Sequence, residues 1–123
     1  MKRTKKVYPV KDLPNIKEQI LHWINQFSVC SFLDNHQYHS AHHSVECIAA
    51  AGEIGIIQGA NTAQQIDAFY TTHQDWLFGH FSYEYNAKHL NKIQKKNPIN
   101  FSDAFFFRPD HILTLKQEWL IIE

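Results

Sequence analysis

The chain has 123 residues, a length that fits one domain or part of one. Apolar residues make up 44% of the chain and aromatic residues 14%, so it can bury a core and does not have the composition of a disordered protein. The formal net charge is zero at pH 7, so the charge balance does not indicate the broad basic surface that general nucleic-acid-binding proteins need.

The N-terminal residues 1–6 are basic, but no apolar segment follows them as it would in a secretory signal. No segment has the ~20 consecutive apolar residues of a membrane-spanning helix. Cys30 and Cys47 lie in apolar stretches, and without an export signal we expect both to be reduced core residues. These features predict a cytoplasmic protein with neither a nucleic-acid nor a membrane partner.

The first third of the chain predicts a helix between two extended segments. Residues 1–11 are polar and predict a loose arm or an edge strand. Asp12 can cap the helix that follows, and Pro14 suits its first turn. Its apolar residues recur at helical spacing and are Ile16, Ile20, Trp23 and Phe27. Residues 27–33 are β-branched and aromatic, which favours a strand.

The middle of the chain predicts a second strand and a second helix. Residues 45–52 read as a strand, and the short apolar piece 54–57 follows it. Asn61 and Gln64 have the spacing of a capping box, so we expect a helix to begin there. Its apolar face would consist of Ala63, Ile66, Phe69 and Tyr70.

The last part of the chain predicts a strand, a third helix and a hairpin. Residues 75–83 have strand character, and residues 83–94 have apolar side chains at helical spacing. The aromatic segment 101–107 is expected to pack into a core. Residues 111–115 and 119–122 flank a polar turn and predict a β-hairpin.

Taken together, these elements predict an α+β fold with a largely antiparallel sheet and about three helices in one domain, residues 1–123. The sequence stops at Glu123, directly after apolar strand residues. We therefore expect a partner or further chain to continue the sheet there.

Four histidines gather in one polar loop, which the sequence predicts between two strands. They are His36, His39, His42 and His43, with Asp34 and Glu46 nearby. Imidazoles and carboxylates are ligands for transition metals, but the spacing matches neither structural zinc sites nor helical His-x-x-x-His pairs. We expect a polar surface loop, with a metal-binding protein as a remote alternative. No serine, cysteine or histidine motif predicts a catalytic residue or a metal ligand.

Three segments together resemble the N-terminal region of the chorismate-utilising synthase family, which includes component I of aminodeoxychorismate (p-aminobenzoate) synthase and of anthranilate synthase. Residues 31–35 and 44–52 resemble that family's strand–loop–strand, in which a Leu-Leu-Glu-Ser type motif precedes a strand rich in alanine and glycine. Residues 75–84 are similar to a Gly-x-x-Ser-Tyr-Asp stretch, and residues 101–109 to a Phe-Pro-Asp-x-Phe-Phe-x-x-Pro segment. The order matches from about residue 14 onward.

The resemblance implies that the chain is the non-catalytic N-terminal portion of a longer enzyme with an α/β sandwich fold. Such enzymes aminate chorismate, and their C-terminal catalytic domain, whose motifs do not occur in this chain, binds chorismate and Mg²⁺. A glutamine amidotransferase subunit often supplies the ammonia. The resemblance favours the aminodeoxychorismate branch of folate precursor synthesis. The alternatives are an anthranilate synthase of tryptophan synthesis and a stand-alone ligand-binding or regulatory module.

The family's N-terminal region also contributes to a tryptophan pocket, and the resemblance carries this pocket to a set of positions in this chain. They are Leu33, Asp34, Asn35, His42, His43 and Val45. The chain departs from the family where Asn35 replaces serine and Asp34 replaces glutamate. An asparagine amide can still bond an ammonium or a carboxylate group, because it both donates and accepts.

Overall fold

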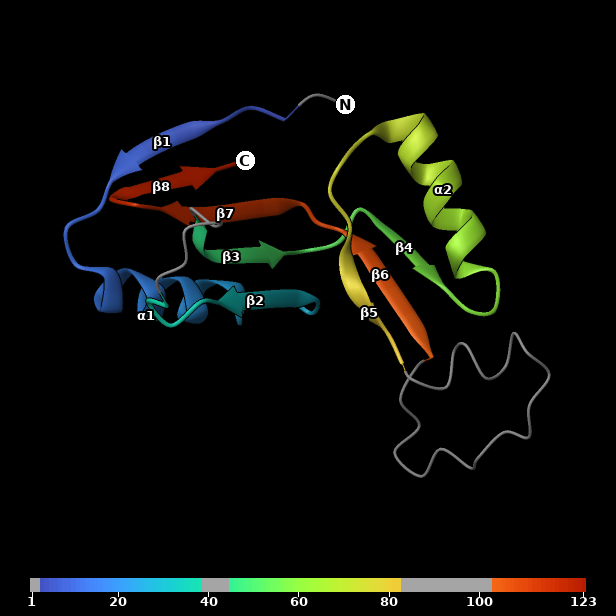
Figure 1. The fold of residues 1–123 in the computed structure, drawn as a ribbon, viewed down its shortest axis with the longest axis horizontal. Coiled ribbons are helices and arrows are strands. Elements are labelled where there is room, and N and C mark those ends of the chain that lie inside the picture. The colour runs from blue at the N-terminus through green and yellow to red at the C-terminus, as the bar shows by residue number, and fades with distance from the viewer. Residues whose placement is uncertain (1–2, 39–44, 83–102) are drawn as a thin grey trace. The chain divides into compact units, whose positions relative to one another are not determined.

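A computed structural model describes residues 3–38, 45–82 and 103–123, and in these residues the fold is α+β, as predicted (Figure 1). The described elements are β1 (Lys6–Pro9), α1 (Leu13–Ile24), β2 (Cys30–Asp34), β3 (Val45–Ala51), β4 (Gly55–Gln58), α2 (Thr62–His73), β5 (Phe78–Phe81), β6 (Ala104–Arg108), β7 (His111–Lys116) and β8 (Trp119–Ile122). The predicted third helix, residues 83–94, lies outside the described residues.

The elements form two compact units, each with its own antiparallel sheet. Unit 1 comprises Met1–Glu53 and Pro109–Glu123 and holds a five-stranded sheet in the order β1-β8-β7-β3-β2. Unit 2 is Ile54–Arg108 and holds a three-stranded sheet in the order β4-β6-β5. Each strand pair described is antiparallel, which confirms the predicted sheet type.

Helix α1 forms where its sequence signals agree. The Asp12 side chain accepts a hydrogen bond from the backbone N–H of Asn15 at 3.2 Å, so it caps the helix as predicted. Ile20 and Ile24 are each 3% exposed and face the sheet. The core of unit 1 is made of these two isoleucines with Cys47, Ala49, Ala51, Leu113, Leu115 and Leu120.

Strand β2 begins at Cys30, three residues later than the predicted start at residue 27. The chain leaves α1 through tight turns, in which the Phe27 N–H donates to the Ile24 carbonyl at 3.0 Å. The Phe27 ring then packs edge-on against Trp23, with 4.9 Å between ring centroids. Phe27 therefore belongs to the helix end and not to the strand. Cys30 is also exposed, so the prediction that both cysteines lie in the core was wrong for it.

The predicted C-terminal hairpin is confirmed as β7 and β8, with Leu115 opposite Leu120. Gln117 takes a positive φ of 55° in the turn. Strand β8 is an interior strand, because β7 pairs with one side of it and β1 with the other. The end of the sequence therefore does not leave β8 as the open edge of this sheet.

Helix α2 begins as predicted at Thr62, but the predicted capping box does not form. The Asn61 side chain makes no cap hydrogen bond, since Asn61 has φ −101° and ψ 25° and is not extended. The Thr62 hydroxyl instead donates to the Gly59 carbonyl at 2.6 Å. The predicted apolar face of α2 is only partly buried, and Tyr70 is 66% exposed.

Strand β6 lies at the centre of unit 2 and contains part of the aromatic segment 101–107. Phe107 is 3% exposed and contacts the Phe78 ring of β5, with 6.1 Å between centroids. The prediction that this segment packs into a core is confirmed for Phe107. Gly79 of β5 allows the strands to approach, because a Cβ atom there would overlap the Phe105 carbonyl oxygen.

Candidate ligand site

The β2–β3 connection brings together part of the predicted site. Asp34 ends β2 and lies opposite Cys47 of β3, and the Asn35 N–H donates to the Glu46 carbonyl at 2.9 Å. Val45 begins β3 and is half-buried. His42 and His43 of the predicted site lie outside the described residues.

The side chain of Leu33 points away from that of Asp34. Side chains alternate between the two faces of a strand, so Leu33 and Asp34 point to opposite faces. Asp34 shares the face of Phe32, which packs against the core under α1. Leu33 is on the other face and is 57% exposed.

A lysine on α1, which the sequence reading did not select, lies at the centre of the site. The Lys17 Nζ atom lies 2.8 Å from Asp34 Oδ1 and 2.6 Å from Glu46 Oε1. The three side chains are 13%, 15% and 15% exposed, respectively. Lys17, Asp34 and Glu46 therefore form a charged cluster that is largely withdrawn from water, and we call them the Lys17 cluster.

A β-bulge allows Glu46 to join the Lys17 cluster. The register of β3 against β7 shifts between Val45 and Cys47. In a regular strand Glu46 would point to the face opposite Cys47, away from α1. A bulge inserts one residue and re-aims a side chain, and here it turns the Glu46 carboxylate toward Lys17.

The turn after β2 supplies further hydrogen bonds to both carboxylates. His36 and Gln37 have positive φ values of 54° and 60°, as in a type I′ turn, and the Tyr38 N–H closes the turn on the Asn35 carbonyl at 3.1 Å. The His36 N–H donates to Asp34 Oδ1 at 3.0 Å, and the Gln37 N–H donates to Glu46 Oε1 at 2.5 Å. The turn backbone thus fixes the carboxylates beside Lys17.

The pKa values of the cluster are shifted in the direction that keeps all three groups charged. Burial opposes ionisation of Asp34 and Glu46, but the hydrogen bonds from Lys17 and from the turn outweigh it and lower both carboxyl pKa values. Burial likewise opposes the charge on Lys17, and the two carboxylates outweigh it and raise its pKa. Beneath the cluster, burial raises the pKa of the Cys47 thiol to about 11, so this cysteine is not a thiolate nucleophile at neutral pH.

The Lys17 cluster is not suited to proton transfer at neutral pH. Its two carboxylates and one ammonium group carry a net charge of −1. The Asn35 amide lies beside the cluster and donates to the Tyr38 carbonyl at 2.6 Å and to Glu46 Oε2 at 3.5 Å. A general acid or base would need a pKa near the working pH, and these shifts move the pKa values away from it.

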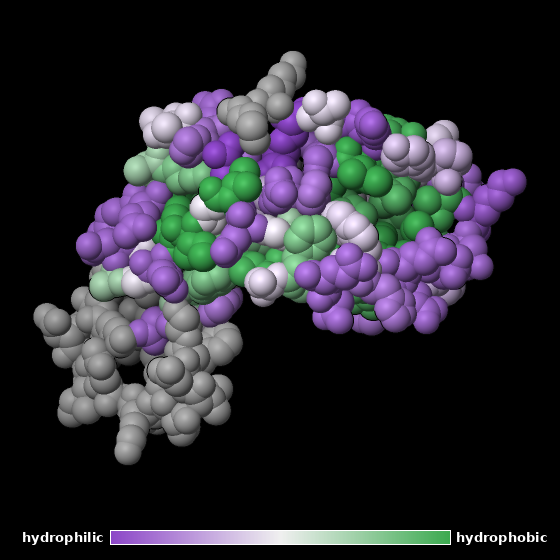
Figure 2. Space-filling view, turned by 180° about the vertical axis from the view of Figure 1, so that it is seen from behind, coloured by the Kyte–Doolittle hydropathy of each residue, from purple (hydrophilic) through white to green (hydrophobic). Residues whose placement is uncertain are grey.

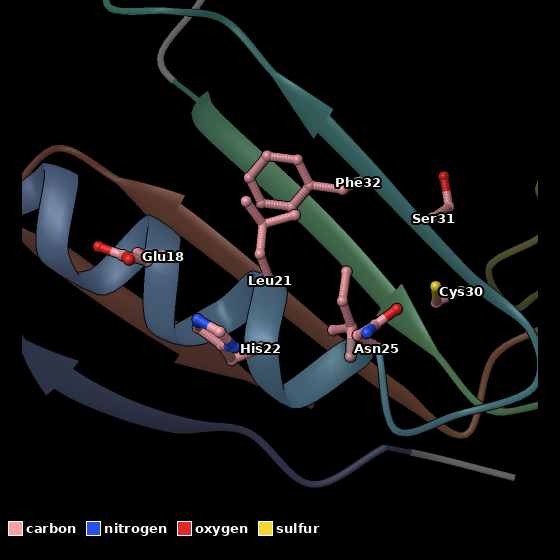
Figure 3. Close-up of a pocket in the computed structure, with 8 residues that line it drawn as sticks. Glu18, Leu21, His22, Asn25, Cys30, Ser31 and Phe32 are labelled. Carbon is pink, nitrogen blue, oxygen red and sulfur yellow. The ribbon is translucent and has the colours of Figure 1, made fainter.

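A separate open groove of about 410 Å³ lies between α1 and β2 (Figure 3). Glu18, Leu21, His22, Ile24 and Asn25 line it from α1, and Cys30, Ser31 and Phe32 line it from β2. None of the predicted site residues that the structure describes lines it, and neither do the three residues of the Lys17 cluster.

The described residues contain no group of three or more histidine, cysteine, aspartate or glutamate side chains placed to hold a metal ion. His36 is described, and its Nδ1 atom lies 3.4 Å from Asp34 Oδ2. His39, His42 and His43 lie outside the described residues. Neither α1 nor α2 has the length and apolarity that a membrane-spanning helix requires.

Comparisons with known proteins do not assign this chain. No family model, no curated protein and no solved structure matches it.

The sequence does contain a signal for Lys17. Lys17 lies three residues before Ile20 and seven before Ile24, so it occupies the apolar stripe of α1. A charged residue in such a stripe needs a buried partner. The partners, Asp34 and Glu46, are far along the chain, and only the strand pairing and the bulge reveal them.

Proposed function

We propose that this chain is the N-terminal, non-catalytic portion of a chorismate-utilising synthase of the aminodeoxychorismate synthase component I type. In this role it holds an amino-acid ligand of the tryptophan kind beside the Lys17 cluster. The observation that carries the proposal is the placement of the resembling segments. They fall on two pairs of neighbouring, hydrogen-bonded strands.

The first pair of segments lies in unit 1. Residues 31–35 and the described part of residues 44–52 form β2, β3 and their flanks, and the strands pair from Cys30 opposite Ala51 to Asp34 opposite Cys47. The family's strand–loop–strand requires such a pairing. In this chain, Asp34 and Asn35 lie next to the start of β3.

The second pair lies in unit 2. The described parts of residues 75–84 and 101–109 contain β5 and β6, which pair with Phe78 opposite Phe107. Two segments that are distant in sequence are therefore direct neighbours. Both resemble parts of the same N-terminal region of the family.

The electrostatics of the Lys17 cluster support an amino-acid ligand. A free amino acid carries an ammonium group, which the excess negative charge of Asp34 and Glu46 attracts. The side-chain oxygen of Asn35 can accept a hydrogen bond from an ammonium group, although asparagine is bulkier than the family's serine.

The face of the unit 1 sheet opposite α1 is partly exposed, and this supports a larger sandwich. On the face opposite α1, one residue from each strand forms a cross-strand row: Val7, Ile121, Thr114, Ile48 and Leu33. Its two end members, Val7 and Leu33, are 55% and 57% exposed. Figure 2 shows apolar residues at the surface among hydrophilic ones on the side of the molecule opposite to Figure 1, without labelling single residues. An apolar row of this kind is a surface for further chain to cover.

On this proposal the chemistry takes place in a C-terminal catalytic domain, where chorismate and Mg²⁺ bind, in the cytoplasm. A glutamine amidotransferase subunit supplies the ammonia. This chain contributes ligand binding and structural support. An anthranilate synthase would have the same N-terminal architecture, and only the product separates the two branches.

The first test is the intact mass of the native gene product in its own cells. We expect a species several times heavier than the 14.5 kDa of this chain. Incubating the purified product with chorismate, Mg²⁺ and ammonia should then consume chorismate, and chromatography should identify aminodeoxychorismate rather than anthranilate. A native product of 14.5 kDa, or a long product that leaves chorismate intact, would overturn the proposal.

The second test is tryptophan binding by isothermal titration calorimetry, with the native product. Glu46→Gln should weaken binding by about tenfold, because it removes one charge beside the ligand's ammonium group. Glu53→Gln is the matched control, since Glu53 is an exposed glutamate outside the cluster. Equal affinities for both variants would remove the Lys17 cluster from the binding site.

A further inference from the structure

The two edges of the unit 1 sheet differ in how they are protected. An exposed edge strand can pair with another chain, and proteins block this with lysine and proline. Strand β1 has both, in Lys6 and Pro9. Strand β2 has neither, and its one charged side chain, Asp34, is held by Lys17 at 2.8 Å.

The open hydrogen-bonding groups of β2 can be assigned from its pairing with β3. The Gly52 N–H donates to the Val29 carbonyl, and the Asn35 N–H donates to the Glu46 carbonyl, both at 2.9 Å. Backbone groups in an antiparallel ladder alternate in direction along a strand. Residues 29, 31, 33 and 35 therefore bond to β3. Cys30, Phe32 and Asp34 direct their N–H and C=O groups to the other side of β2, where no described strand pairs with it.

We propose that β2 pairs antiparallel with β2 of a second copy of this chain, about a two-fold axis at Phe32, to form one continuous sheet. In this register Phe32 lies opposite Phe32 of the second copy, and Cys30 lies opposite Asp34. The outward N–H and C=O groups of Cys30, Phe32 and Asp34 then all form hydrogen bonds. In an antiparallel ladder, each such pair of opposite residues exchanges two hydrogen bonds. A shift of the strand by two residues in either direction would leave outward groups unpaired.

The groove beside β2 is compatible with this partner. Helix α1 runs antiparallel to β2, since Lys17 contacts Asp34 at one end and Asn25 shares the groove lining with Cys30 at the other (Figure 3). The two-fold axis therefore sets Glu18, the acidic residue of the groove, toward the neutral Asn25 of the second copy. In this arrangement the grooves of the two copies are adjacent, and the Glu18 carboxylates of the two copies do not face each other.

Charge also favours a second copy as the occupant. The formal net charge of the chain is zero, so two copies do not repel each other. The strand itself is an extended, largely apolar segment that can pair with its own edge, and the Asp34 side chain is held by Lys17 within each copy. The interface is isologous, with the same surface contributed by both copies.

The first experiment measures the mass of the 123-residue chain in solution by light scattering after size exclusion, over a range of concentrations. We expect a species of twice 14.5 kDa that dissociates on dilution. A chain that stays monomeric at every concentration would overturn the proposal.

The second experiment tests the register with opposite charges at one exposed position. Cys30→Asp sets an aspartate opposite Asp34 of the second copy and should weaken the dimer by about tenfold or more. Cys30→Lys places a cation there and should dimerise more tightly than Cys30→Asp. Tyr8→Asp, on edge strand β1, should leave the dimer unchanged. Equal dimerisation of the two Cys30 variants, or loss of the dimer in Tyr8→Asp, would contradict the β2 interface.

The third experiment maps the pairing by oxidation. In the proposed register Ser31 lies opposite Leu33 of the second copy, at a spacing that suits a disulfide. In a Cys30→Ser background, a mixture of the Ser31→Cys and Leu33→Cys chains should therefore give a cross-linked heterodimer. Neither variant should cross-link to itself. Self-linked Ser31→Cys or Leu33→Cys homodimers would mean a different register and would refute the two-fold axis at Phe32.

Discussion

The two helices have the same length and each packs against an antiparallel sheet, yet they are held in different ways. Helix α1 has a side-chain cap and buries Ile20 and Ile24 to 3% exposure. Helix α2 has no side-chain cap bond, and Thr62 in its first turn is its one buried residue. Helix formation in proteins depends mainly on the packing of an apolar face. The difference therefore indicates that α1 is part of the core of unit 1, whereas α2 covers unit 2 more loosely.

The charged side chains also have more complete hydrogen bonding in unit 1 than in unit 2. In unit 1, one lysine is shared by two carboxylates, and turn N–H groups complete their hydrogen bonds. In unit 2, Arg108 Nε pairs with Asp75 Oδ2 at 2.7 Å, and its guanidinium lies 5.7 Å from the centre of the Phe69 ring. Its Nη2 atom is buried without a hydrogen-bond partner. Unit 2 thus relies on aromatic and cation–π contacts where unit 1 has a hydrogen-bonded network.

The largest predicted effect concerns the close strand approach in unit 2. Gly79→Ala should destabilise unit 2 by about 4 kcal/mol, because the added Cβ would overlap the Phe105 carbonyl oxygen and approach Phe106 Cα to 2.6 Å. Gly55→Ala in the same sheet is the control, since its Cβ would lie 3.8 Å from Arg108 Cβ, an ordinary contact. Urea unfolding followed by the fluorescence of Trp76, with the other tryptophans replaced by phenylalanine, measures both. Equal effects would mean that the sheet relaxes around residue 79.

The next prediction tests the difference between the helices directly. Ile24→Ala in α1 removes a residue that is 3% exposed and should cost about 3 kcal/mol of unfolding free energy. Ile66→Ala in α2 removes a half-buried residue and should cost about 1 kcal/mol. The unfolding of unit 1 can be followed by the fluorescence of Trp23 and that of unit 2 by Trp76, each with the other two tryptophans replaced by phenylalanine. Similar costs would show that α2 is as firmly packed as α1.

Local sequence signals predicted the local structure of unit 1 well. The α1 prediction was right because Asp12, Pro14 and the apolar spacing all indicate the same helix. The hairpin of β7 and β8 was predicted because a short polar turn separates two apolar runs. The predicted start of the strand at Phe27 was wrong because its β-favouring neighbours suggested a strand, whereas its packing on Trp23 agrees with its predicted place on the apolar side of the helix.

The candidate site could be predicted only in part, because its geometry is not local. The sequence selected Asp34 and Asn35 by resemblance, and the fold places both beside Lys17. The role of Glu46 depends on a bulge, and no sequence pattern marks that bulge. Leu33 was selected with Asp34, but the alternation of a strand separates their side chains.

A smaller effect, with a characteristic pH dependence, is expected for the Lys17 cluster. Lys17→Met should destabilise unit 1 by about 2 kcal/mol at neutral pH, since it leaves two largely buried carboxylates without their cation. The pKa values of Asp34 and Glu46 are lowered by folding, so their contribution is present above their ordinary values of 3.8 and 4.5. It is lost as the pH falls through the lower folded values.

The raised pKa of Lys17 sets the pH above which the Lys17 cluster no longer stabilises unit 1. The stabilisation is fully present below the ordinary lysine pKa of 10.5 and lost as the pH rises through the folded value. Comparing the urea stability of wild type and Lys17→Met across pH measures both limits. The difference should shrink below about pH 4, where the carboxylates begin to take up protons. Lys11→Met, at an exposed lysine, is the control, and a difference independent of pH would show that packing, not charge, dominates.

The smallest effect compares the two helix caps. Asp12→Ala removes the acceptor of the Asn15 N–H and should cost unit 1 about 1 kcal/mol. Asn61→Ala removes a side chain that makes no cap hydrogen bond, so unit 2 should change by only about 0.3 kcal/mol. Thermal unfolding by circular dichroism at the α-helix band, with urea titration of each variant, measures the two. If Asn61→Ala costs as much as Asp12→Ala, the Asn61 side chain caps α2 in solution, and one of the differences between the helices disappears. If only Asp12→Ala is costly, the local hydrogen bond and the buried isoleucines together account for the firmer attachment of α1.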